Sequence, residues 1–255
     1  MMNMKGKTAL VLGVANQRSI AYSIAKALSS AGAELILSYV NATLAKRVEP
    51  IAAELGAKLT IECDLGDDEA IQRLGAKIRK QYDSLDCIVH SVAYAPVEEM
   101  NKPFHHTSRE GFGIALDISV YTLIAVLKEL EDLLKPGSSV LTLSYLGAQK
   151  VVPNYGVMGV AKAALEAAVR YLAYSMGEQG VRVNAVSAGP LRTLSTAAIS
   201  GIIDLQKQIA ATSPLRRNID HEEVAKSALY LLSDCSSGVS GEVIFVDAGM
   251  NIMAY

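Results

Sequence analysis

Short apolar runs alternate along the chain with longer segments in which apolar residues recur every three or four positions. The short runs are rich in Val, Ile and Leu and are almost continuously apolar. That pattern is typical of strands covered on both faces in a parallel sheet. It predicts seven strands, at residues 8–12, 34–39, 58–63, 86–90, 139–144, 181–187 and 242–246.

The periodic segments between these runs predict helices at residues 19–31, 67–82, 108–134, 155–177 and 222–233. Ser19 is a candidate N-cap for the first of them, and Gly32 follows its end. Pro50 interrupts the segment 43–55, so a kinked or split helix is expected there. In segment 155–177 the apolar positions form one stripe that predicts a core-facing helix. They are Val157, Val160, Ala161, Ala164, Leu165, Ala168, Val169, Leu172, Ala173 and Met176.

Seven strands alternating with helices predict an α/β fold, a Rossmann-type doubly wound seven-stranded parallel sheet in a three-layer α/β/α arrangement. No linker, repeat or low-complexity segment interrupts the pattern, so we expect one domain over residues 1–255. The small- and Ile-rich segment 195–213 follows the sixth predicted strand. We interpret it as a helical flap over a site.

Composition narrows the function. Apolar residues make up 51 % of the chain and charged residues 20 %, and the formal net charge is −2. This balance gives no basic field for binding nucleic acid. The three cysteines are scattered, which fits neither a disulfide framework nor a metal site. No signal segment and no membrane-spanning apolar run is recognised, so we expect a cytoplasmic protein with reduced thiols and no membrane partner.

The turn after the first predicted strand, residues 13–21, is a candidate phosphate site. Free backbone N–H groups and the helix dipole point toward such a turn. Gly13 would permit close backbone approach, and Ser19 could contact a phosphate. The turn holds a single glycine, however, and an ordinary strand–turn–helix with a capped start explains it equally well.

The second predicted strand ends in Ser38-Tyr39-Val40-Asn41, with no acid for a ribose and no adjacent cation for a 2′-phosphate. The nearest cations, Lys46 and Arg47, lie further on. The absence of a close cation favours NADH over NADPH. Asp64 could accept a hydrogen bond from an adenine amino group, or could be a turn or cap residue. His90 ends the fourth strand and is expected to be a hydrogen-bonded structural residue rather than a catalyst.

Tyr155 and Lys162 are the candidate chemical pair. Seven residues place both on one helix face, about 10 Å apart along the axis. At the C-terminal edge of the sheet that face would point into a ligand crevice. A tyrosine hydroxyl can donate a proton to a developing oxyanion, and a nearby ammonium assists. The alternative is a tyrosine at a helix start and a lysine that snorkels to the surface.

Several strings along the chain occur together in one known family. They are G-V-A-N-Q-R-S-I-A at 13–21, L-T-L-S-Y-L-G-A at 141–148, P-N-Y-G-V-M-G-V-A-K-A at 153–163, R-V-N-A-V-S-A-G-P-L-R-T-L at 182–194 and S-G-E-V-I-F-V-D-A-G at 240–249. On these strings the chain resembles the NADH-dependent enoyl-acyl-carrier-protein reductases of type II fatty-acid synthesis. They are a divergent branch of the short-chain dehydrogenase/reductase family. The resemblance spans nearly the whole chain, in order.

The larger branch of that family has its lysine four residues after the tyrosine, where this chain has Gly159. The spacing has a chemical meaning. A ketone reductase delivers hydride to the carbon that bears the protonated oxygen. An enoyl thioester reductase delivers it to the β-carbon, while the oxyanion forms further away, on the thioester. A tyrosine one turn further from its lysine suits that longer reach.

The resemblance implies a role for each matching residue. Tyr155 would bind the thioester oxygen and stabilise the enolate, Lys162 would bind the nicotinamide ribose, and Tyr145 would be a second tyrosine with an open share in proton delivery. The residues implied to line NADH are Gly13, Ser19, Ile20, Val40, Asp64, Leu65, Val92, Lys162, Leu191, Arg192, Thr193, Leu194 and Ser195. Ala95 and Tyr155 would touch the substrate. Met158, Ile199 and Ile202 are candidates for an apolar acyl tunnel or for plain core.

The family pattern and this chain differ at two positions. Val40 stands where many relatives carry Gln, and Ile202 where an aromatic is common, which leaves cofactor and chain-length preference open. The resemblance also implies acyl carrier protein as partner and a homotetramer. The carrier is acidic in this family, so Lys207, Arg216 and Arg217 are candidates for a basic docking surface, with solvated surface as the alternative.

Two other functions use the same fold. A carbonyl reductase or alcohol dehydrogenase would need the lysine that Gly159 replaces. A non-catalytic NAD-binding sensor would keep the fold, although such proteins commonly lose the tyrosine or the lysine, and both are present here.

Overall fold

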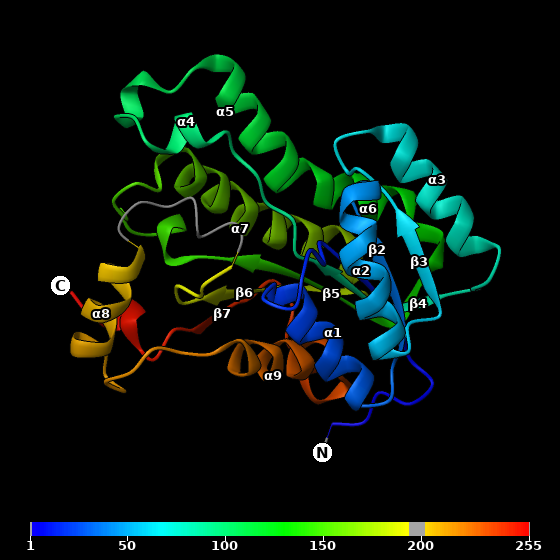
Figure 1. The fold of residues 1–255 in the computed structure, drawn as a ribbon. Coiled ribbons are helices and arrows are strands. Elements are labelled where there is room, and N and C mark those ends of the chain that lie inside the picture. Colours follow the sequence, from blue (N-terminus) through cyan, green and yellow to red (C-terminus); the bar gives the residue numbers. More distant parts are fainter. Residues whose placement is uncertain (1, 194–201, 255) are drawn as a thin grey trace.

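The computed structural model describes residues 2–193 and 202–254. Its centre is a sheet of seven parallel strands in the order β3-β2-β1-β4-β5-β6-β7 (Figure 1). All seven predicted strands are confirmed. Their bounds are β1 Thr8–Leu12, β2 Glu34–Tyr39, β3 Leu59–Glu62, β4 Leu85–His90, β5 Leu134–Ser144, β6 Arg182–Ala188 and β7 Val243–Val246.

Helices cover both faces of the sheet, so the predicted three layers are confirmed (Figure 1). They are α1 Ile20–Ser30, α2 Ala42–Leu55, α3 Asp68–Arg79, α4 Val97–Met100, α5 Arg109–Leu116, α6 Thr122–Glu129, α7 Gly156–Gly177, α8 Ile202–Thr212 and α9 His221–Leu232. One core layer packs α1, α2 and α9 on the sheet, through residues such as Ile24, Val48 and Leu231. The other packs α3, α6 and α7, through residues such as Leu74, Val126 and Leu165.

The helix predicted at 108–134 is confirmed over Arg109–Glu129, but it is irregular in the middle and ends before residue 134. The segment consists of α5, a π-helical turn at Asp117–Tyr121, α6 and a short 3-10 turn at Glu131–Leu133, and β5 begins directly after it. Side chains compete with the regular helix here. The Thr122 hydroxyl donates to the carbonyl of Ile118 at 2.7 Å, and Ser119 is fully buried and hydrogen-bonded to the backbone of Tyr94.

The stretch Arg109–Glu129 is long and apolar enough, by length and composition alone, to cross a membrane. In the structure its buried side chains, including Ala115, Leu123 and Val126, pack inside the fold against α7 and α3. That is the packing of a core helix in a globular protein.

Of the kinked or split helix expected at Pro50, the split is not observed, because α2 continues through the proline. Val48, Ile51 and Leu55 are buried on the sheet on either side of it. Burial of that face outweighs the single backbone hydrogen bond that a proline removes.

Helix α7 differs in part from its predicted apolar stripe. Val160 is 37 % exposed, whereas Met158, Lys162 and Glu166 are buried. The first turns of α7 therefore cover a partly polar site as well as the core. The predicted flap is helical where α8 forms its second part, and residues 194–201 lie outside the described residues.

Candidate active site

The site lies at the carboxyl ends of β1, β4, β5 and β6. The strand order reverses between β1 and β4, and open α/β sheets bind their ligands in the crevice at such a point. The segments that follow these four strands carry most of the predicted site residues.

The turn after β1 is built for close approach of backbone. Gly13 has φ +93°, and a Cβ at this position would clash with the carbonyl of Ser91 after β4. Ser19 caps α1: its hydroxyl accepts from the N–H of Tyr22 at 3.2 Å and donates to the carbonyl of Asn16 at 2.7 Å. The expected cap is therefore confirmed, and the tight turn that a dinucleotide requires is present beside it.

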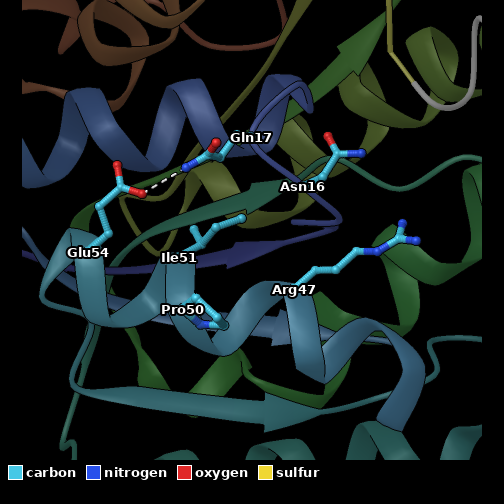
Figure 2. Close-up of a pocket in the computed structure, with 6 residues that line it drawn as sticks. All are labelled: Asn16, Gln17, Arg47, Pro50, Ile51 and Glu54. Carbon is cyan, nitrogen blue, oxygen red and sulfur yellow. Dashed lines mark hydrogen bonds between the residues drawn. The ribbon is translucent and has the colours of Figure 1, made fainter.

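A cavity of about 310 Å³ lies beside this turn (Figure 2). It is lined by Asn16, Gln17, Arg47, Pro50, Ile51 and Glu54. The Glu54 carboxylate ties α2 to α1, because it accepts from Gln17 at 3.0 Å and from the hydroxyl of Tyr22 at 2.8 Å. Figure 2 shows the Arg47 side chain extending along the pocket toward Asn16. Helix α2 thus brings a cation nearer to the turn than its place in the sequence indicated.

The other residues predicted to line the dinucleotide follow β2, β3 and β4, except Ile20, which is the first residue of α1. Val40 and Asp64 are exposed, Leu65 is buried, and Ile20 and Val92 are half-buried. The Asp64 carboxylate accepts from the N–H of Gly66 at 3.0 Å, so it is a turn residue whatever else it binds.

His90 is a structural histidine, as expected. It is buried, with Nε2 2.9 Å from the hydroxyl of Thr122 and Nδ1 3.2 Å from that of Thr142. Burial, and to a lesser extent the charge of Lys162, lowers the pKa of His90 to about 3. The ring is therefore neutral at physiological pH.

Tyr145 and Tyr155 form an edge-to-face pair, with ring centroids 4.9 Å apart and an interplanar angle of 73°. Tyr145 directly follows β5, and Tyr155 precedes the first residue of α7 and is 9 % exposed. Burial raises the pKa of Tyr145 to about 12, and burial together with Tyr145 raises the pKa of Tyr155 further. Both phenols are thus protonated at neutral pH and can donate a hydrogen bond.

Lys162 lies two turns along α7 and is 6 % exposed, so the snorkelling alternative is wrong. Its Nζ donates to the carbonyl of Leu143 in β5 at 2.7 Å. Burial lowers the pKa of Lys162 to about 8, and the negative charge of Glu166 opposes that shift. The structure therefore brings Tyr145, Tyr155 and Lys162 to the same end of β5 and α7.

The region expected to meet the substrate is a small apolar cluster. Ala95, Met158 and Tyr155 pack there with Met100, Ala115 and Val157. Of the other tunnel candidates, Ile199 lies outside the described residues, and Ile202 is the first residue of α8, whose side chain is not described.

The segment after β6 contacts α8. Arg192 Nε donates to the Gln206 side chain at 3.0 Å, and the Gln206 amide donates to the carbonyl of Pro190 at 2.9 Å. Leu191 is buried and Thr193 is half-buried, whereas Leu194 and Ser195 lie outside the described residues. Gln206 thus joins the predicted cofactor-covering segment to the predicted flap.

The candidate basic surface is largely neutralised. Lys207 lies 3.4 Å from Asp204, and Arg217 lies 2.6 Å from Glu223. Arg216 donates to the carbonyl of Ala211. Among residues 2–193 and 202–254, no group of three or more His, Cys, Asp or Glu side chains could hold a metal ion.

Sequence reasoning missed Glu166, which is buried one turn beyond Lys162. It accepts from Ser144 at 2.6 Å and from Gln149 at 3.1 Å. The available signal was its position four residues after Lys162, which places both on one helix face. The apolar stripe that predicts the helix gives no indication of this buried acid.

Comparison with known proteins agrees with this geometry. The family model described as Enoyl-(Acyl carrier protein) reductase matches residues 13–251. The NADH-dependent enoyl-acyl-carrier-protein reductase FabI of Escherichia coli K12 is 49 % identical over 255 residues, covering 98 % of this chain and 96 % of that protein.

Solved structures are equally similar. The enoyl-acyl-carrier-protein reductase (NADH) of Aquifex aeolicus VF5 has a TM-score of 0.96 at 49 % identity, and 99 % of each chain is covered. The reductase of Anaplasma phagocytophilum, solved in complex with NAD, has a TM-score of 0.95 at 43 % identity, covering 100 % of this chain and 95 % of that one. Because the family model and these relatives extend over nearly the whole chain, this protein belongs to the enoyl-acyl-carrier-protein reductase family.

Proposed function

We propose that this protein reduces the trans-2 double bond of enoyl thioesters carried on acyl carrier protein, with NADH, in type II fatty-acid biosynthesis. The observation that carries the proposal is the edge-to-face pair of Tyr145 and the buried Tyr155 beside the end of β5, with the buried Lys162 two helical turns beyond Tyr155. This arrangement supplies a proton donor and a cation where an enolate would form.

NADH supplies a hydride to the β-carbon of the enoyl chain. Tyr155 donates a hydrogen bond from its phenol to the thioester oxygen, which takes up negative charge as the β-carbon is reduced. Because burial keeps the phenol protonated, this donor is present before the charge develops. The α-carbon then takes a proton, and Tyr145 lies in ring contact with Tyr155 as a candidate relay.

Lys162 holds the nicotinamide ribose in this proposal. One of its three N–H groups is used by the carbonyl of Leu143, and the others are available for ribose hydroxyls. Gly13, Ser19, Ile20, Val40, Asp64, Leu65, Val92 and the segment 191–195 line the rest of the dinucleotide. Gln206 holds the described part of that segment against α8. Ala95 and Met158 contact the acyl chain.

The carbonyl reductase alternative requires a side chain at position 159. A Cβ there would lie 2.9 Å from the carbonyl oxygen of Gly147, in the 3-10 turn Leu146–Ala148 that carries the loop after Tyr145. A lysine at this position would therefore displace the backbone beneath Tyr155. The local packing supports the enoyl reductase spacing.

The assembly we propose is a homotetramer in the cytoplasm. Along α7, Val160, Tyr171 and Tyr174 are 37 %, 78 % and 85 % exposed, and their spacing puts them on one face. Tyr121 and Ile124, in the neighbouring π-turn and α6, are exposed as well. Exposed apolar surface of this kind marks an interface. The free thiols of Cys63, Cys87 and Cys235 agree with a reducing compartment.

The direct test is consumption of NADH on addition of a trans-2-enoyl thioester, first crotonyl and then longer chains, on acyl carrier protein. We expect turnover that depends on the double bond. A ketone panel serves as the control. No turnover of any enoyl thioester with either NADH or NADPH, together with binding of NADH by calorimetry, would instead identify a sensor.

A further inference from the structure

A buried carboxylate on α7 accepts hydrogen bonds from residues at both ends of the loop that carries Tyr145. Glu166 is 5 % exposed and lies on α7 about three helical turns beyond Tyr155. Each of its carboxylate oxygens has one neutral donor. Oε1 accepts from the Ser144 hydroxyl at 2.6 Å, and Oε2 accepts from the Gln149 amide at 3.1 Å. Burying a carboxylate costs free energy unless hydrogen bonds or a nearby positive charge compensate for the lost water.

The two donors flank the loop that carries the catalytic tyrosine candidate Tyr145. Ser144 is the last residue of β5, and Gln149 follows the 3-10 turn Leu146–Ala148. The loop has no slack against α7, because a Cβ on Gly147 would lie 2.5 Å from the Tyr155 ring. Glu166 thus fixes both ends of the segment whose middle packs on Tyr155.

The same carboxylate is the negative charge that acts on Lys162. The two residues are one helical turn apart, and no ion pair within 4 Å joins Lys162 to an acid in the described part of the chain. The other titratable groups around Lys162 are neutral near pH 7: His90 from β4, and Tyr145 and Tyr155. Glu166 therefore stabilises the ammonium form in a site where burial disfavours it.

We propose that Glu166 is a positioning residue of this reductase: it clamps the ends of the Tyr145 loop onto α7 and places a negative charge one helical turn from Lys162. The proposal rests on the proposed enoyl reductase function for its kinetic consequences. Its effect on Lys162 and on the loop is independent of which substrate is reduced.

The test is Glu166→Gln, which keeps the shape and removes the charge. We expect kcat to fall about 10- to 100-fold, because the hydrogen bonds to the ends of the Tyr145 loop lose their charge assistance and hold the tyrosine pair less firmly. We also expect the midpoint of Lys162 titration, followed by NMR of the apoenzyme with isotope-labelled lysine, to move to lower pH by roughly one unit. The alkaline limb of the kcat/KM profile moves the same way.

Two variants separate the two actions of Glu166, and a third is the control. Ser144→Ala removes one leg of the clamp and keeps the charge, so kcat falls while the lysine midpoint stays. Glu166→Asp retains the charge on a shorter arm and gives the same pattern, and it replaces the Gln variant if that variant does not fold. Glu129→Gln, in the surface pair with Arg79, is the matched control and leaves both readouts unchanged.

An unchanged lysine midpoint and an unchanged kcat in Glu166→Gln would overturn the proposal. So would lower thermal stability with neither readout altered, since that describes a merely structural residue. Absence of enoyl reduction in the wild type would sink the proposed function alone, because the NMR midpoint still tests the effect of Glu166 on Lys162.

Discussion

Burial changes the acidity of Tyr155 and Lys162 in opposite directions. It raises the pKa of the phenol and lowers that of the ammonium, because in each case it disfavours the charged form. The phenol is therefore held as a proton donor. The pKa of the lysine is lowered to about 8, which is close enough to pH 7 for the protonation state to depend on neighbouring charges.

Tyr155→Phe removes the donor and keeps the ring that packs against Tyr145 and Gly147. We expect kcat to fall about 100- to 1,000-fold, the usual effect of losing one donor to a developing oxyanion. The Kd for NADH, measured by fluorescence, stays near the wild-type value. Tyr171→Phe, on the exposed face of α7, is the control. Equal losses of binding and turnover would instead assign Tyr155 a structural role.

Lys162 gives a prediction for stability against pH. Its pKa in the folded chain, about 8, lies below the ordinary value of 10.5, so the folded state releases its proton first as pH rises. The unfolded state then binds more protons between these pKa values, and the free energy of unfolding increases across that window. Relative to Lys162→Met, we expect the wild type to gain up to roughly 3 kcal/mol between pH 7 and pH 10.5.

Denaturant titrations of both proteins at the two pH values measure this difference, and the tyrosines common to both largely cancel. A wild type that gains no stability relative to Lys162→Met over this range would show that burial does not lower the pKa of the lysine in the apoenzyme.

At the scale of elements, α7 and the loop after β5 fit together through two glycines. Gly147 leaves room for the Tyr155 ring, and Gly159 leaves room for the carbonyl of Gly147. The spacing of tyrosine and lysine is thereby coupled to the shape of the loop. A lysine four residues after the tyrosine would require a different loop.

Gly159→Ala tests that coupling. Alanine favours a helix over glycine by about 1 kcal/mol, yet we expect a net loss of about 1 to 3 kcal/mol in the free energy of unfolding, because the new methyl meets backbone. Gly113→Ala in α5, where a Cβ would meet nothing within 4 Å, is expected to stabilise the protein instead. If the two variants behaved alike in denaturant titrations, the close contact at Gly159 would be refuted.

The elements also show which features of the fold a sequence pattern can predict. Strands buried on both faces leave an apolar run that composition alone reveals, and all seven were predicted. The π-turn was not predicted, because Ser119 finds its carbonyl partner on Tyr94, 25 residues away in sequence, and only the fold brings the two together. The role of Glu166 was not predicted for a similar reason, because its partners Ser144 and Gln149 are 22 and 17 residues away in sequence.

At the scale of the molecule, the sheet order brings four strand ends together at one crevice. The turn with Gly13, the Tyr145 loop and the start of α7 meet there. The opposite, exposed face of α7 is free in the single chain, and the proposed tetramer would cover it.

Replacing Tyr171 and Tyr174 by Glu tests the tetramer. Both side chains are largely exposed, so the double variant should fold as a monomer or dimer, since buried like charges would oppose association. Light scattering after size-exclusion chromatography gives the mass directly. Tyr230→Glu on α9 is the control, at a partly exposed site away from α7. A wild type that is already monomeric would contradict the proposed assembly.

The most direct test of the central claim follows the hydride itself. The protein is given NADH deuterated at the transferring position of the nicotinamide ring, together with a crotonyl thioester, and the product is analysed by NMR. The account predicts a saturated thioester with deuterium on the β-carbon, and loss of that product in Tyr155→Phe. Deuterium on the former carbonyl carbon, in an aldehyde or alcohol, would contradict it.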